Sequence, residues 1–234
     1  MLSYILRRLL QLIPTFVFVL IVVFLLVRLL PGDPASAMLG DRAKDADVLR
    51  INHDLGLDQP LPVQFLYFAK AMVTGNLGDS NSMRLPVIEL IEQRMPVTLL
   101  LTAMAAIIAL ILAVPLAFLA AYKRDGAADT VIRGIFQFGL SVPVFYLGIV
   151  LLTVFGARLG WFPVGGYGDG FVDHLRHLVL PAMTLALTLA AILLRNLRAA
   201  IIGVVGAEYV DFARAKGLKP RLIMLRHVLR NALI

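Results

Sequence analysis

Four long apolar runs constrain this chain more than any other feature. They cover residues 9–27, 95–122, 134–157 and 178–194, and none of them contains Asp, Glu, Lys or Arg. A helix needs about 20 mostly apolar residues to cross the hydrocarbon core of a bilayer. Backbone polar groups inside a bilayer must be satisfied within the segment, which favours helices. The sequence therefore predicts an all-α polytopic membrane protein, with four spans at about 9–30, 95–122, 134–157 and 177–198.

The composition supports this class and excludes several kinds of chemistry. Hydrophobic residues make up 60% of the chain and charged residues 16%, which is not the balance of a soluble domain. The net charge is +7, but the basic residues lie next to the apolar runs, which indicates topology determinants and anionic-lipid contacts rather than nucleic-acid binding. The chain has no cysteine for a disulfide or a thiolate metal site. It also has no GxxxxGK[ST] loop, so we expect no ATPase site of that kind and no bound cofactor.

The distribution of basic residues predicts the orientation in the membrane. With the N-terminus inside, 13 basic residues flank the spans on the inner side, namely Arg7, Arg8, Lys123, Arg124, Arg133 and eight between 195 and 230. The short outer loop holds two, Arg158 and Arg176. Short loops on the cytoplasmic side carry the excess of Lys and Arg. We therefore expect a cytoplasmic N-terminus and a cytoplasmic segment 207–230.

The polar segment 31–94 is expected outside the cytoplasm. The apolar run before it is 19 residues long, longer than the core of a usual signal peptide (about 7–15), so we expect it to be retained as the first span. A turn at 31–34 and short helices at 48–55 and 63–72 are predicted within the segment. It also holds a cluster of acidic residues with basic residues between them, which we interpret as a solvated loop rather than a metal site: Asp33, Asp41, Asp45 and Asp47.

The segment 207–230 is strongly basic and too polar to span a membrane. Gly217 suits the left-handed position just past a helix, and Pro220 suits the first turn of the next helix. The pattern predicts two short helices bent about a glycine, which form a protruding knob. The alternative is an amphipathic helix that lies on anionic lipid.

This segment carries a resemblance to a known family. It is similar to the cytoplasmic loop of permease subunits in bacterial ABC importers, whose signature is Glu-Ala-Ala, three residues and Gly. Asp211, Phe212, Ala213 and Gly217 occupy those positions, so Asp replaces Glu and Phe replaces the first Ala. FARAKG followed by LRHVLRNAL resembles the branch that imports dipeptides, oligopeptides, nickel chelates and glutathione. The resemblance extends along all 234 residues.

The resemblance implies partners and roles for particular residues. It implies a type I ABC importer fold in the bacterial inner membrane, with a single permease domain over residues 1–234 and two further spans in full-length members. It implies a second homologous permease, an extracytoplasmic solute-binding protein, and two ATPase subunits that bind the ATP and Mg²⁺. Contact with an ATPase subunit would be made by the coupling residues Glu208, Asp211, Ala213, Arg214, Lys216 and Gly217.

Polar residues within the spans are the candidates for a pore or gate. Each run contains proline, namely Pro14, Pro115, Pro143 and Pro181, and proline kinks a helix. Hydroxyl pairs spaced four apart lie on one helix face, where they would line a passage or join neighbouring helices. The candidates are Thr98, Thr102, Gln137, Ser141, Pro143 and Thr184. His174 and His177 share a helix face, but without a third ligand we expect a structural role for them.

Together these observations predict a transport subunit without enzymatic activity. The spans carry no ionisable residue of the kind that couples ion gradients to transport, which favours energy supplied from outside the membrane. The alternatives are a secondary carrier or channel with a lipid-binding basic loop, and a membrane scaffold without transport. The sequence does not distinguish among the solutes.

Overall fold

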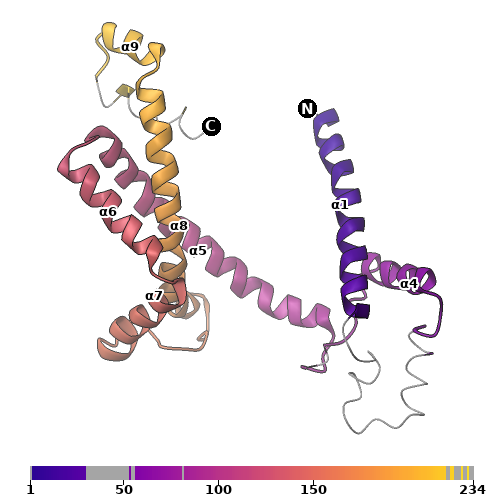
Figure 1. The fold of residues 1–234 in the computed structure, drawn as a ribbon. Helices are drawn as coiled ribbons and strands as arrows, with labels where there is room; N and C mark the ends of the chain where they lie inside the picture. The colour runs from indigo at the N-terminus through magenta and orange to yellow at the C-terminus, as the bar shows by residue number, and fades with distance from the viewer. Residues whose placement is uncertain are drawn as a thin grey trace. The chain divides into compact units, whose positions relative to one another are not determined.

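The structure is a computed structural model that describes residues 2–29, 53, 56–80, 82–219, 222, 223, 228 and 231. The regular elements in this part of the chain are helices (Figure 1): α1 (Leu2–Leu29), α4 (Leu61–Val73), α5 (Val87–Tyr122), α6 (Ala127–Ser141), α7 (Val144–Leu151), the π-helix η1 (Leu152–Arg158), α8 (Phe171–Val205) and α9 (Glu208–Ala215).

Three of these helices, α1, α5 and α8, are long and apolar enough to cross a membrane, and α6 with α7 and η1 gives a fourth span if the bent pair is one span. The predicted all-α polytopic fold is confirmed. Each of the three helices extends beyond the predicted span, because the flanking polar residues continue the helix outside the apolar run. The predicted turn at 31–34, the acidic cluster and Pro220 lie outside the described residues, as does the predicted helix at 48–55 apart from His53.

The third predicted span, 134–157, is not one straight helix. The chain breaks after Ser141, and the helices on either side of the break are bent by 101°. Val142 is extended (φ −83°, ψ 127°) and Pro143 caps α7. Proline disfavours a helical conformation in the residue before it, which accounts for the break. By contrast, Pro14, Pro115 and Pro181 lie inside continuous helices.

The described residues fall into two compact units, Met1–Met95 and Pro96–Ile234. In the first unit, the C-terminal end of α1 packs on α4. The Phe24 ring lies 5.5 Å from the ring of Phe65 and 5.8 Å from that of Phe68, measured between centroids. Arg28 Nε donates to Gln64 Oε1 (2.8 Å), and Gln64 Nε2 donates to the backbone carbonyls of Leu57 and Gln59. α4 extends the helix predicted at 63–72 by a few residues.

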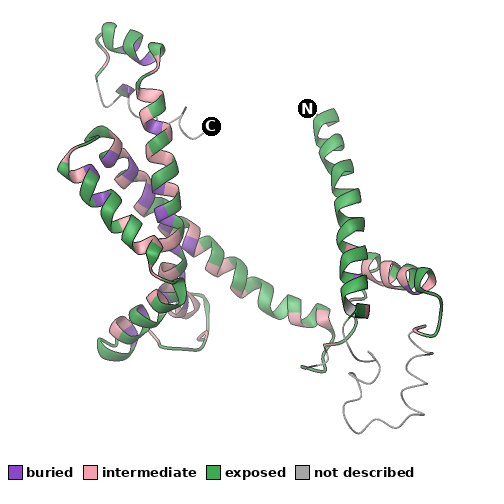
Figure 2. Ribbon diagram, viewed as in Figure 1, coloured by how far each residue is buried: buried purple, intermediate pink, exposed green. Residues whose placement is uncertain are grey.

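The core of the second unit is built from small residues at every fourth position. Ala109, Ala113 and Ala117 form one buried stripe on α5, and Ala186 and Ala190 continue in the same cluster from α8. Figure 2 shows the buried residues where α5, α6 and α8 meet. Small side chains allow helix backbones to approach closely, which replaces the hydrophobic driving force that is missing between helices in lipid. This packing makes α8 a rigid support for α9.

Candidate functional site

The segment after α8 forms a compact knob centred on α9. α8 ends at Val205, and α9 begins at Glu208, after a short turn. Acidic Glu208 and Asp211 lie in the first turn of α9, and Arg214 lies in the last turn. These charges complement the helix dipole, positive at the N-terminus and negative at the C-terminus. The charge order of the sequence therefore stabilises a helix that is only eight residues long.

Gly217 ends this helix in the way that the sequence predicts. Its φ is +74°, in the left-handed region that glycine adopts without steric cost. The Gly217 N–H donates to the Arg214 carbonyl (2.9 Å), and the Leu218 N–H donates to the Ala213 carbonyl (3.3 Å). This pair of bonds is the Schellman motif, which satisfies the last carbonyls of a helix. Leu218 then packs against the buried cluster, so the chain reverses at a fixed angle.

One face of α9 is buried within the chain. Val210 is fully buried and Ala213 is 7% exposed, and both belong to the cluster that includes Ile201 of α8, Ile223 and Val228. Ala213 is one of the predicted coupling residues, and its side chain packs beneath the helix. Its spacing of three from Val210 places it on the inward face. A small residue at this position lets α9 lie close to its own support.

The opposite face of α9 is exposed and charged. The other predicted coupling residues are exposed and lie outside the buried cluster: Glu208, Asp211, Arg214, Lys216 and Gly217. Arg214 Nη1 donates to Asp211 Oδ1 at 3.2 Å, one turn along the helix. An exposed pair of this kind contributes little to stability, so its charges remain available for a partner.

Two aromatic residues on α9 belong to this surface, although neither was among the predicted coupling residues. Phe212 is 68% exposed while its neighbour Ala213 is buried. Tyr209 is also exposed, and its hydroxyl accepts a hydrogen bond from Asn231 Nδ2 (3.0 Å). The sequence does contain a signal for Phe212, because a phenylalanine on the charged side of an amphipathic helix indicates a contact surface. Exposed aromatic residues of this kind are frequent anchors in protein interfaces.

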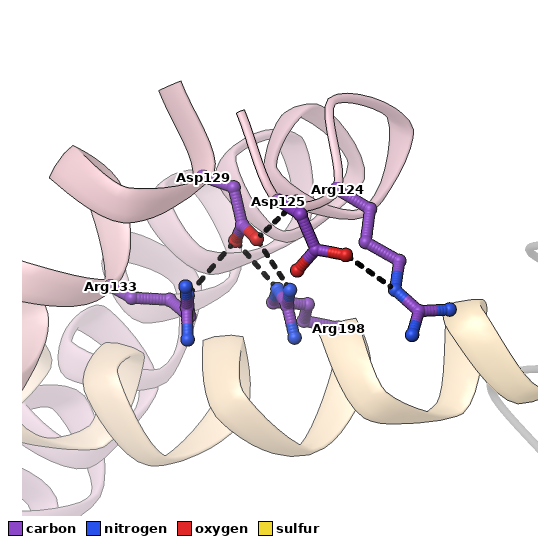
Figure 3. A network of polar contacts seen from close by, with 5 residues as sticks. All are labelled: Arg124, Asp125, Asp129, Arg133 and Arg198. Atoms are coloured by element: carbon purple, nitrogen blue, oxygen red, sulfur yellow. Dashed lines mark hydrogen bonds and ion pairs between the residues drawn. The ribbon is translucent and has the colours of Figure 1, made fainter. Parts of the chain in front are cut away.

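A buried ion-pair network ties α8 to α6 below the knob, as Figure 3 shows. Asp129 of α6 is fully buried, and its carboxylate accepts hydrogen bonds from Arg198 Nε (2.7 Å) and Arg198 Nη2 (2.5 Å). The Asp125 N–H also donates to Asp129 (3.0 Å), and Arg133 Nε lies 3.2 Å from the same carboxylate. Arg198 lies in the last third of α8, so the network fixes the helix that carries α9.

The predicted pore and gate residues do not gather at one place. Thr184 lines a cavity of about 610 Å³ between α7, α8 and the loop after η1, next to Gly148 and His177. Gln137 lines a separate groove between α6 and α8. Pro143 stands at the helix break.

The hydroxyls of three of these candidates bond to their own helices. Thr102 Oγ1 donates to the Thr98 carbonyl (2.7 Å), Ser141 Oγ to the Gln137 carbonyl (3.2 Å) and Thr184 Oγ1 to the Leu180 carbonyl (2.9 Å). Each bond runs to the residue four positions earlier. Such bonds satisfy a hydroxyl inside a membrane helix and leave its oxygen lone pairs facing outward.

The two histidines before the fourth apolar run have structural contacts. The His174 ring stacks on Tyr167, with 3.8 Å between centroids and 12° between planes. His177 Nδ1 lies 2.8 Å from the Asp173 carbonyl. These contacts hold the loop at 159–170 against the first turns of α8. Among the residues that the structure describes, no group of three or more His, Cys, Asp or Glu side chains is placed to hold a metal ion.

Comparison with known proteins assigns the chain to a family. The family described as binding-protein-dependent transport system inner membrane component matches residues 113–234, and its N-terminal region matches residues 1–102. The glutathione transport system permease protein GsiC of Pectobacterium atrosepticum is 40% identical over 234 residues, which cover 100% of this chain and 75% of the relative. The GsiC protein of Escherichia coli K12 is 40% identical over 235 residues, with the same coverage.

A third relative, named a probable peptide ABC transporter permease protein (y4tP), comes from Sinorhizobium fredii. It is 37% identical over 232 residues, which cover 98% of this chain and 74% of the relative. The branch that the sequence resembles is therefore confirmed by relatives with peptide and glutathione names. The chain belongs to the family of inner-membrane components of binding-protein-dependent transport systems, the multi-pass permease subunits of ABC transporters.

Proposed function

We propose that this chain is the transmembrane subunit of an importer that passes peptides or a similar small solute into the cytoplasm, driven by ATP that separate ATPase subunits hydrolyse. The solute class rests on the names of relatives, which are glutathione and peptide permeases. The observation that carries the coupling is the outward face of α9. It combines Phe212 with exposed acidic and basic side chains on a helix fixed by Gly217.

The contacts beneath α9 support a path by which movement passes from α9 to α8 and α6. Val210 and Ala213 bury one face of α9 on the same cluster as Ile201 of α8, so a force on α9 moves α8. Arg198 then connects α8 to Asp129 of α6. Closure of ATPase subunits on α9 would move these helices together as a rigid body and open the path between the two membrane faces.

The remaining partners complete the proposed assembly. A second homologous permease forms the other half of the pathway, and an extracytoplasmic solute-binding protein delivers the solute. The N-terminus and α9 face the cytoplasm, because 13 basic residues flank the spans on that side. ATP and Mg²⁺ bind to the ATPase subunits.

Cysteine cross-linking tests the proposed contact, because α9 offers a matched pair of alanines. Ala215 is exposed and Ala213 is buried, two residues apart on the same helix. In membranes that contain the whole transporter, Ala215→Cys should cross-link to an ATPase subunit that carries a cysteine in its docking groove. Ala213→Cys should react several-fold less. Equal reaction of both, or labelling of Ala215→Cys only from the outer face, would reject the docking surface.

Uptake into proteoliposomes tests the energy source. Vesicles with the complete transporter and its binding protein should accumulate peptide only when ATP is present on the side of α9. Uptake that follows an ion gradient without ATP would instead indicate a secondary carrier. Binding without any uptake would indicate a scaffold.

A further inference from the structure

A groove of about 550 Å³ between α6 and α8 has a basic end and an apolar end. Arg133, Arg195 and Arg198 supply guanidinium groups, and Phe136 and Leu140 supply apolar surface. On each helix these residues are three or four positions apart, so they lie on facing sides of α6 and α8. The transport function proposed above uses Arg198 only as a link between α8 and α6, and it assigns no ligand to this groove.

The two kinds of residue are separated along the groove. α6 and α8 run in opposite directions, since Asp129 at the start of α6 pairs with Arg198 near the end of α8. The arginines cluster near this pair, at the end where α6 begins. Phe136 and Leu140 lie further along α6, within the apolar run 134–157. Charge therefore lies at the membrane border and apolar surface lies deeper.

The basic end carries more positive charge than its own acid neutralises. Arg133 and Arg198 both contact Asp129, so two guanidinium groups share one carboxylate. Arg195 adds a third guanidinium and is exposed. None of the described residues that line the groove is acidic. Three positive charges and one negative charge leave an excess of two, which favours an anion at this end.

We propose that this groove binds an anionic phospholipid, with the phosphate headgroup at the three arginines and an acyl chain along Phe136 and Leu140. Basic pockets between membrane helices on the cytoplasmic side are typical sites for anionic headgroups. The order of charge and apolar surface matches the order of headgroup and chain in a lipid. A small free anion would leave the apolar end of the groove without a ligand.

Photo-cross-linking with a phosphatidylglycerol analogue that carries a diazirine in its acyl chain tests this site. The probe is incorporated into nanodiscs with the whole transporter, and labelled peptides are mapped by mass spectrometry. We expect labels within 134–141 and 190–199. Arg195→Gln should weaken labelling about fivefold. One arginine near an anionic membrane contributes about 1 kcal/mol of attraction, which corresponds to about a fivefold change in binding. The exposed position of Arg195 predicts an unchanged unfolding midpoint for this variant.

The matched control is Arg124→Gln, because Arg124 pairs with exposed Asp125 and does not line the groove. It should leave labelling unchanged. Three results would overturn the proposal: labelling that is equal for Arg195→Gln and the unaltered chain, equal labelling by a phosphatidylcholine analogue, or full displacement of the probe by inorganic phosphate. Displacement by the transported peptide would also overturn it and would assign the groove to the solute.

Discussion

Asp129 and Arg198 lie 69 residues apart in the sequence and form a two-point ion pair between α6 and α8. The carboxylate is fully buried and the guanidinium is mostly buried. Both oxygens of Asp129 accept from the same guanidinium, a geometry that arginine provides and lysine does not. The pair therefore fixes both the distance and the angle between the two helices near the base of α9.

Removal of one partner from this pair should destabilise the fold. Asp129→Asn leaves Arg198 and Arg133 without their shared carboxylate, and an uncompensated buried charge costs about 3–5 kcal/mol. Because Arg198 is partly exposed, we expect a loss near the low end, about 3 kcal/mol. The unfolding midpoint in detergent measures this loss.

Asp125→Asn is the control for this prediction. Asp125 and Arg124 form an exposed pair in the same turn, so its loss should change stability by less than about 1 kcal/mol. Combining Asp129→Asn with Arg198→Gln should recover part of the loss, because neither charge is then left alone. Equal effects of Asp129→Asn and Asp125→Asn would contradict a structural role for the buried pair.

The sequence could predict the membrane spans because apolar runs report directly on the solvent around a helix. It could also predict the left-handed turn at Gly217, since only a few residue types adopt that conformation without strain. The break at Pro143 could not be located in the same way. Each run holds a proline, and a membrane helix accommodates one when neighbouring groups satisfy the freed carbonyl. Which proline breaks its helix depends on tertiary packing.

The sequence predicted only part of the candidate site, because the rest of the site also depends on tertiary packing. The alternation of buried and exposed residues on α9 depends on which side faces α8. A small residue such as Ala213 suits close packing on either side, so its sequence position did not reveal that it faces inward. The contact between Asp129 and Arg198 depends on the packing of two helices far apart in the chain. Local patterns carry no signal for it.

Two glycines at the same end of the chain should respond to alanine with opposite signs. Gly217 has φ +74°, and a Cβ at this position would meet no atom within 4 Å, so Gly217→Ala incurs only the backbone cost, about 1 kcal/mol. Gly203 lies inside α8, also with open space around it, and Gly203→Ala should stabilise by about 0.5–1 kcal/mol. Thermal unfolding of both variants measures the difference. A stabilising effect at Gly217 would mean that the left-handed turn is absent.

The contact between α7 and α8 depends on the missing side chain of Gly148. A Cβ at this position would lie 3.3 Å from Thr184 Cγ2, which is closer than ordinary van der Waals contact. Gly148→Ala should therefore push the helices apart at a cost of about 1–3 kcal/mol, which exceeds the helix-propensity gain of about 0.5–1 kcal/mol, so we expect a net loss of about 1 kcal/mol. Thr184→Ser removes the opposing methyl group and should restore most of this loss in the double variant. Gly139→Ala on α6, with no atom within 4 Å, should show no such loss.

Phe212 should contribute more to assembly than the charged residues around it. Its ring is 68% exposed on a surface that is otherwise charged, and the burial of such an anchor typically contributes about 2 kcal/mol or more to an interface. Phe212→Ala should weaken ATPase binding about 30-fold while the unfolding midpoint stays within error, since the ring has little contact in this chain. Phe138→Ala is the matched control, because Phe138 is 73% exposed on α6 and outside the proposed docking surface. Co-purification of the ATPase subunits measures the binding, and peptide-stimulated ATP hydrolysis measures whether the bound subunits are coupled. If Phe212→Ala and Phe138→Ala retain the ATPase equally, Phe212 is not the anchor. The charged residues of α9 would then have to account for the docking.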